Sequence, residues 1–449
     1  MRELLTSGLN LSIVRNLILS GVALAFGGGA ALAGPLLPSS QKTYASACLE
    51  KVVSFERLIE ICALGLGDAG ASAQQRQKMR SILAWQYYFA DENSKAQALF
   101  EEMLSDDHRS DEAILGLGWV AYDADDYAQA SDLFSQALQL HPGAEAVAGL
   151  ASSLWRSDRI GFEEASQRFQ AAQAIDPEYR WALREEAWLN VEHGGTFDRA
   201  EILFQAALEI DPDDQYALYG LTYIYTELDR WEEALQAANR ALEIDPSYLA
   251  VLSRRSLAYL FLDLPKLSLK DGQALIKAAP EDVGGYVRVA RAMNALGQRQ
   301  QALAVLANAN AQLGYNAYLV HWLAKFYFFE KSYAKAEAQL NRIMAKEEGD
   351  YFDYKLLGRV YLGQKDYEQA RSAFDRGMAL TSDTSWLRYY RSRILIAEGH
   401  YNAAEAEFDT AVAEGLPVSK LDRFIAYLVG QRQYVQAIKM RVRYENMAD

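Results

Sequence analysis

The chain repeats itself every 34 or 35 residues, and this period constrains its fold more than any other feature. Successive units begin at Gln77, Asp111, Glu145, Arg180, Gln215, Leu249, Val283, Ala317, Tyr351, Ser385 and Ser419. A period of this length is typical of proteins built from stacked supersecondary units, each of which packs mainly against its neighbours. The 449 residues therefore need not be divided into several globular domains.

Small and aromatic residues recur at fixed places within the units. The eighth residue is always small: Ala84, Gly118, Ser152, Ala187, Thr222, Ser256, Ala290, Ala324, Gly358, Ser392 and Ala426. A second small residue follows later in ten of the units, and in six units a phenylalanine stands four residues after it: Phe100, Phe134, Phe169, Phe204, Phe374 and Phe408. Residues four apart lie on one face of a helix, and proline ends several units, so each unit predicts two closely packed helices.

Composition supports an all-α fold. Alanine, leucine and glutamate are abundant, the alternation of β-branched residues typical of strands is scarce, and only 9 prolines occur.

The units resemble the tetratricopeptide repeat family, whose pattern is met closely by residues 111–144, 215–247 and 351–384. The resemblance implies a right-handed α-solenoid of tandem helical hairpins, which we place at residues 77–418. We expect a divergent hairpin at residues 34–76 and a capping hairpin at residues 419–449, with Arg441 and Arg443 making its end polar. The unit beginning at Leu249 departs most from the pattern.

Residues 1–33 differ from the rest and predict a signal peptide. Arg2 and Arg15 precede an apolar run that ends in Ala31-Leu32-Ala33, an A-x-A processing site. An uncleaved membrane anchor is the alternative. We therefore expect a periplasmic or secreted protein, in contact with a membrane only if this segment is retained.

Cys48 and Cys62 are the only cysteines, and both follow this segment. In an oxidising compartment two such residues commonly pair. Fourteen residues of straight helix would separate them by about 21 Å, so a disulfide requires the chain to fold back near Val53 to Glu56. Two buried thiols are the alternative.

Catalytic chemistry is not indicated. The 5 histidines are scattered over different units, without the spacing of a metal site or a catalytic triad, and we predict no enzymatic activity, cofactor or metal. The net charge of -15 disfavours nucleic acid as a partner.

The family resemblance also implies that the ninth residue of each first helix faces a ligand groove. Early units place aromatic residues there: Trp85, Trp119, Trp188 and Tyr223. Later units place cations there, with further cations nearby: Arg291, Lys325, Arg359 and Arg393, joined by Lys355 and Arg423. Two alternatives remain open, namely that the rings only pack between helices and that acidic residues of adjacent helices neutralise the cations.

These residues predict a non-enzymatic interaction scaffold of the cell envelope. Cations in register favour an extended peptide or acidic segment of a partner protein, because arginine binds carboxylates through two parallel hydrogen bonds. The alternative is a carbohydrate-binding scaffold in polysaccharide export or assembly, with an anionic polysaccharide as ligand, because flat rings also suit sugar faces.

Overall fold

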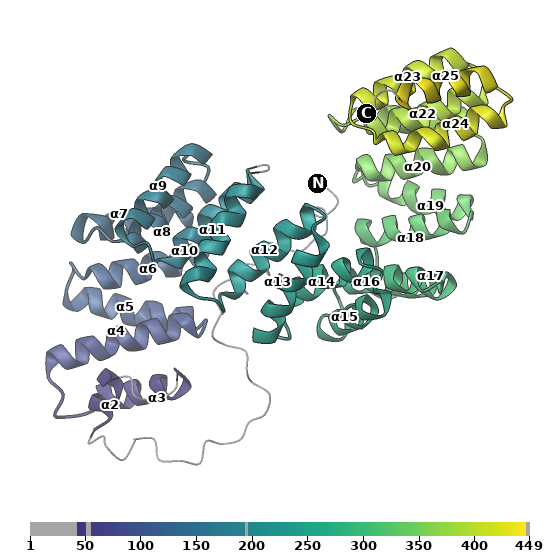
Figure 1. The fold of residues 1–449 in the computed structure, drawn as a ribbon. Helices are drawn as coiled ribbons and strands as arrows, with labels where there is room; N and C mark the ends of the chain where they lie inside the picture. The colour runs from purple at the N-terminus through teal and green to yellow at the C-terminus, as the bar shows by residue number, and fades with distance from the viewer. Residues whose placement is uncertain (1–42, 51–54, 194–195, 446–449) are drawn as a thin grey trace. The chain divides into compact units, whose positions relative to one another are not determined.

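The computed structural model describes residues 43–50, 55–193 and 196–445, and within these ranges the chain is helical with no β-strand. Consecutive helices pack side by side as hairpins (Figure 1). The predicted all-α solenoid of helical hairpins is confirmed. The signal-peptide prediction for residues 1–33 lies outside the described residues, as does most of the expected turn between the cysteines.

The described residues form two compact units, divided between Ala258 and Tyr259 inside α14. The N-terminal unit contains α2 (Tyr44–Glu50), α3 (Phe55–Leu66), α4 (Ala73–Phe89), α5 (Asn93–Asp106), α6 (Asp111–Asp123), α7 (Tyr127–Leu140), α8 (Ala144–Arg156), α9 (Phe162–Ile175), α10 (Arg180–Glu192), α11 (Phe197–Ile210), α12 (Gln215–Glu227), α13 (Trp231–Ile244) and most of α14 (Leu249–Phe261).

The C-terminal unit begins with the last residues of α14. It continues with α15 (Pro265–Ala278), α16 (Val283–Ala295), α17 (Arg299–Leu313), α18 (Ala317–Phe329), α19 (Tyr333–Met344), α20 (Tyr351–Gln364), α21 (Tyr367–Met378), α22 (Ser385–Ala397), α23 (Tyr401–Ala413), the 3-10 turn η1 (Val418–Lys420), α24 (Leu421–Gly430) and α25 (Tyr434–Glu445).

The helices begin where the repeat predicts them. The first helices α6, α10, α12, α14, α16, α18, α20 and α22 each start at the first residue of their sequence unit. Helix α8 starts one residue early at Ala144, and α4 starts four residues early at Ala73. The same side chains therefore recur at the same helical position from one hairpin to the next.

A phenylalanine of the second helix is buried at the centre of six hairpins, and small residues make room for it. Phe204 and Phe374 are fully buried. A Cβ atom added to Gly220 would lie 2.3 Å from Cζ of Phe204, and one added to Gly358 would lie 2.3 Å from Cε1 of Phe374. Only glycine leaves enough space at these two positions.

A residue in the left-handed conformation ends most first helices. It recurs at the hairpin turn as Asp91, Asp125, Asp158, Asp229, Asp263, Gly297, Lys331, Lys365, Gly399 and Arg432. A left-handed residue at this place satisfies carbonyl groups that the end of a helix leaves without partners. Glycine adopts it without strain at Gly297 (φ 77°) and Gly399 (φ 82°).

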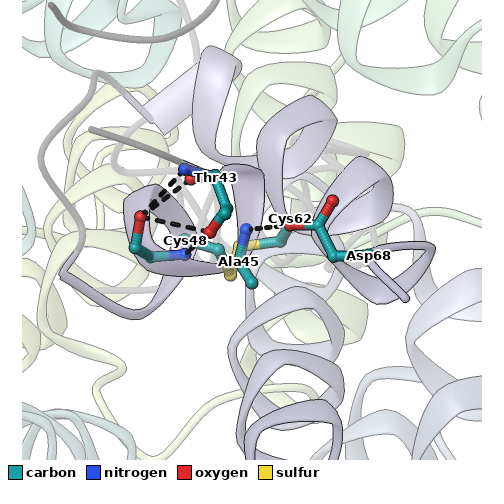
Figure 2. Close-up of a disulfide and its surroundings, with 6 residues drawn as sticks. Thr43, Ala45, Cys48, Cys62 and Asp68 are labelled. Atoms are coloured by element: carbon teal, nitrogen blue, oxygen red, sulfur yellow. Dashed lines mark hydrogen bonds between the residues drawn. A yellow bond between two sulfur atoms is a disulfide. The ribbon is translucent and has the colours of Figure 1, made fainter. Parts of the chain in front are cut away.

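A disulfide joins α2 to α3 through Cys48 and Cys62, whose Cα atoms are 4.9 Å apart (Figure 2). Both sulfur atoms lie in a core with Ile61 and Met79. The Asp68 carboxylate accepts a hydrogen bond of 2.8 Å from the backbone N–H of Ala45, near the start of α2. The bridge therefore connects a seven-residue helix to the hairpin next to it.

The unit at Leu249, which departs most from the pattern, contains the boundary between the two compact units. Pro265 is the first residue of α15, where the missing N–H is tolerated. Gly272 stands in place of the expected phenylalanine, and a Cβ there would lie 3.0 Å from the backbone nitrogen of Val289. Close approach of α15 to α16 thus replaces the aromatic core.

The end of the last hairpin carries both charged and aliphatic side chains. Both arginines pair with acidic residues of neighbouring helices, Arg441 with Asp422 and Arg443 with Asp409. The exposed side chains of α25 also include Val435, Ile438 and Val442, so aliphatic surface lies beside these charges.

Candidate ligand-binding surface

Four cations repeat along one face of the C-terminal unit. Arg291, Lys325, Arg359 and Arg393 occupy the ninth position of α16, α18, α20 and α22, and each of these helices packs against the next in that order. All four side chains are half-buried. We call this set the cationic stripe.

Aromatic rings alternate with the members of the cationic stripe. Trp322 lies against two of them, with its ring centre 5.0 Å from the Arg291 guanidinium and 4.2 Å from Nζ of Lys325. A cation over an aromatic face is attracted by the negative charge of that face. Trp322 therefore holds two positive charges that would otherwise repel each other.

The same arrangement continues along the stripe. The Arg359 guanidinium lies 4.6 Å from the ring of Phe328 on α18 and 5.4 Å from that of Tyr390 on α22. The Arg393 guanidinium lies 4.4 Å from the ring of Tyr427 on α24. Within the described residues neither arginine forms an ion pair, so for these two the neutralisation by adjacent acidic residues does not occur.

Buried polar atoms without partners accompany the far end of the stripe. Nε of Arg393 and the hydroxyl of Tyr389 have no hydrogen-bond partner within the described residues. Burial raises the pKa of Tyr389 to about 12, while the charges of Arg393 and Arg423 act in the opposite direction. Arg423 itself is exposed. This end therefore holds two buried donors that have no acceptor within the described residues.

Lys355 belongs to the same unit but stands one helical turn before Arg359. Its Nζ lies 4.5 Å from the ring centres of both Tyr351 and Phe352 on α20. Lys355 is thus a further cation that is positioned by aromatic rings and lies near the cationic stripe.

The predicted groove aromatics of the N-terminal unit mainly pack against their own hairpins. Trp85 contacts Phe100, with ring centres 5.2 Å apart. Trp119 contacts Phe134 at 4.9 Å, and its side chain is buried. Both rings thus make the packing contacts that the alternative requires, and their role in ligand binding stays a prediction.

The other two predicted aromatics, Trp188 and Tyr223, contact each other with ring centres 5.5 Å apart. Trp188 also packs on Phe204 at 5.5 Å. Tyr223 lies under the guanidinium of Arg254, at 3.8 Å, and Arg254 pairs with Glu227 at 2.9 Å. Both rings remain half-buried.

A contact between two repeats that are not adjacent in the sequence explains why Trp119 is covered. Its ring centre lies 4.7 Å from that of Trp181 on α10. Helix α8 packs against both α6 and α10, and its ninth-position residue is the small, fully buried Ser153. Because Ser153 is small, Trp181 can reach past α8.

A buried polar cluster on α6, α8 and α10 was not predicted. Nε of Arg156 donates a hydrogen bond of 2.7 Å to the hydroxyl of Tyr122, and Oγ of Ser152 donates one of 3.1 Å to Glu185. Burial and the charge of Glu185 raise the pKa of Tyr122 well above its usual value. Tyr122 and Arg156 are both the twelfth residue of their units, and this shared position was the signal available in the sequence.

No helix in the described ranges is both long and apolar enough to span a membrane. No group of three or more His, Cys, Asp or Glu side chains in the same ranges is placed to bind a metal ion.

Comparison with known proteins agrees with this architecture. A family model described as tetratricopeptide repeat matches residues 90–154 and 193–254. A crystal structure of a tetratricopeptide repeat protein from Parabacteroides merdae is 18% identical, with a TM-score of 0.52 over 56% of this chain and 98% of that one. The human IFIT1 dimer with PPP-AAAA is 16% identical, with a TM-score of 0.46 over 82% of this chain and 93% of that one. No curated protein matched the sequence.

Proposed function

Because the chain belongs to the tetratricopeptide repeat family, whose fold is that of a protein-interaction scaffold, we propose that it binds an extended acidic segment of a partner protein along the cationic stripe. The observation that carries the proposal is the state of Arg359 and Arg393, which lie on aromatic rings and form no ion pair within the described residues. Their charges are positioned by the fold and remain available to carboxylates.

Long-range charge favours a short acidic segment over a long polyanion. The chain carries 60 acidic and 45 basic residues, so its overall field repels nucleic acid and other extended polyanions. Positive charge is concentrated on the stripe, where salt would screen a bound carboxylate less than at a fully exposed site. We therefore propose a short acidic segment as the ligand. We also propose that the scaffold has no enzymatic activity.

A polysaccharide ligand is less well supported. It would need exposed rings on which sugars can stack, but Trp119 is buried and Trp85 packs on Phe100. An anionic polysaccharide remains useful as a competitor in binding experiments.

We further propose that the protein acts outside the cytoplasm. The Ala31-Leu32-Ala33 processing site and the disulfide between Cys48 and Cys62 support this location. The protein isolated from its source should have the mass of a chain that starts at Gly34, and reduction should increase this mass by two hydrogens. A mass beginning at Met1, or free thiols in the isolated protein, would contradict export with cleavage.

Charge reversal tests the proposed binding surface. We expect the double variant Lys325→Glu with Arg359→Glu to bind a fluorescein-labelled glutamate-rich peptide at least about 30-fold more weakly than the native chain, because two attractions become repulsions. Fluorescence anisotropy at two salt concentrations measures this effect, and higher salt should weaken binding to the native chain.

The matched control is Lys270→Glu with Arg376→Glu. It makes the same change in net charge on exposed residues of the second helices α15 and α21. We expect it to bind like the native chain. If both double variants lose binding equally, overall charge explains the result and the stripe does not. If the native chain binds no acidic peptide, the proposed function is wrong.

A further inference from the structure

A hollow of about 240 Å³ opens in the C-terminal unit beside the first two members of the cationic stripe. It is lined by Leu260, Phe261, Arg291, Asn294, Trp322, Lys325, Phe326 and Phe329. Phe326 is fully buried, whereas Phe261 is 55% exposed and Phe329 is 37% exposed. Two large rings at the edge of the hollow are therefore left partly in water.

The polar side of the hollow offers positive charge and hydrogen-bond donors. Arg291 and Lys325 both lie against the ring of Trp322. Oδ1 of Asn294 accepts a hydrogen bond of 3.0 Å from Nε of Arg299, and this fixes the amide so that its N–H groups remain donors. A ligand group here meets aromatic surface and an anion-binding edge together.

The size of the hollow limits what it can hold. Small-molecule sites usually measure about 300–1,000 Å³, so this one suits a single large side chain better than a cofactor. A ring or branched aliphatic chain placed between Phe261 and Phe329 would remove apolar surface of all three groups from water.

We propose that this hollow anchors the bound segment through one large apolar or aromatic side chain that has a carboxylate close to it. This inference rests on the proposed function and adds the chemistry by which a partner would be selected. Trp322 is its central residue, because it forms part of the apolar wall and also holds both cations at the edge.

The spacing of the stripe defines the rest of the segment. Lys325, Arg359 and Arg393 occupy equivalent positions in successive packed first helices, and packed helices lie about 8–10 Å apart. A peptide in the polyproline II conformation advances about 3.1 Å per residue with three residues per turn, so side chains three residues apart lie on the same side and about 9 Å apart. Carboxylates at every third residue after the anchor would therefore meet successive cations.

Three labelled peptides of twelve residues test this inference on the full chain. The first has phenylalanine followed by aspartate at every third position in a serine and glycine background. The second has alanine in place of the phenylalanine. The third has the composition of the first with its aspartates adjacent. We expect the native chain to bind the first peptide at least about tenfold more tightly than either of the others.

Paired variants locate the anchor. In Phe261→Ala with Phe329→Ala the first two peptides should bind equally, because the walls that recognise the ring are gone. Phe89→Ala is the matched control, because Phe89 is also the thirteenth residue of its unit and is 44% exposed, but it lies in the N-terminal unit. It should leave the preference for phenylalanine unchanged.

The comparison of peptides on the native chain does not depend on how the variants fold. Equal affinity for the phenylalanine and alanine peptides would overturn the anchor while leaving the proposed acidic ligand intact. Equal affinity for spaced and adjacent aspartates would overturn the three-residue spacing. Failure of all three peptides to bind would overturn the anchor and the proposed function together.

Discussion

Replacing Gly220 with valine is expected to lower the free energy of unfolding of the surrounding hairpins by about 4 kcal/mol, above the usual range for overpacking. Even the Cβ atom would lie 2.3 Å from Cζ of Phe204, and valine adds two further methyl groups. The ring of Phe204 is fully buried, so it cannot swing into solvent. Helices α11 and α12 would have to separate.

Hydrogen exchange resolved by peptide is the suitable measurement, because stability in a repeat array is largely local. We expect exchange to accelerate in α10 to α13, with a lower first transition in thermal unfolding followed by circular dichroism. Gly70→Val is the matched control, since a Cβ at Gly70 has no neighbour within 4 Å. It should change neither measurement.

A second substitution tests the mechanism. As a single substitution, Phe204→Leu destabilises the protein because it removes buried volume. In the double variant with Gly220→Val, the smaller leucine also makes room for the new methyl groups. The double variant should be more stable than the sum of the two single effects by at least about 1 kcal/mol. Simple additivity would show that the clash between these two residues is not the cause of the loss.

The hairpins could be predicted from the sequence because one steric requirement recurs in many of the units. A small residue such as Gly220 or Gly358 is needed wherever a ring such as Phe204 or Phe374 enters between helices. The requirement leaves a visible period, and the period set the starts of most first helices. The repeat pattern does not predict which residues are exposed on the terminal helix α25, such as Ile438, which is 64% exposed.

The sequence predicted the cations of the cationic stripe but not the aromatic rings that contact them. The four cations share the ninth position and could be found, but the rings that hold them stand at several different positions of their units. Trp322 and Tyr390 are sixth residues, Phe328 is a twelfth residue and Tyr427 is a ninth residue. Which ring meets which cation depends on how consecutive helices pack, and a single sequence does not specify that packing.

The aromatic residues of the N-terminal unit show the same limit. Trp119 occupies a position that faces a ligand in the family pattern, yet the small Ser153 lets Trp181 cover it. That the aromatic residues of the early units contact a ligand stays a prediction. In the C-terminal unit rings and cations share one surface, and there the recognition chemistry is mixed.

Replacing Asp214 with alanine is expected to lower the free energy of unfolding of the N-terminal unit by about 4 kcal/mol. The Asp214 side chain is fully buried and accepts hydrogen bonds of 3.0 Å from the backbone N–H groups of Tyr216 and Ala217, so it caps α12. It also pairs with Arg180 at 3.1 Å and Arg184 at 3.0 Å. Loss of the cap costs about 1 kcal/mol. Loss of a buried ionic partner costs about 3 kcal/mol, at the low end of its range because the arginines are partly exposed.

Asp282→Ala separates these two effects. Asp282 occupies the same place before α16 and accepts a hydrogen bond of 2.9 Å from the backbone N–H of Gly284, but it forms no ion pair within the described residues. It should cost only about 1 kcal/mol. Asp214→Asn keeps an oxygen that can cap α12 and removes the charge, so its effect should fall between the two alanine variants. Thermal unfolding measures the loss of stability in each of the three variants, and hydrogen exchange of α10 and α12 measures the local effect. If Asp214→Ala and Asp282→Ala cost the same, the buried ion pairs contribute nothing beyond the cap, because desolvation of the charges cancels their attraction.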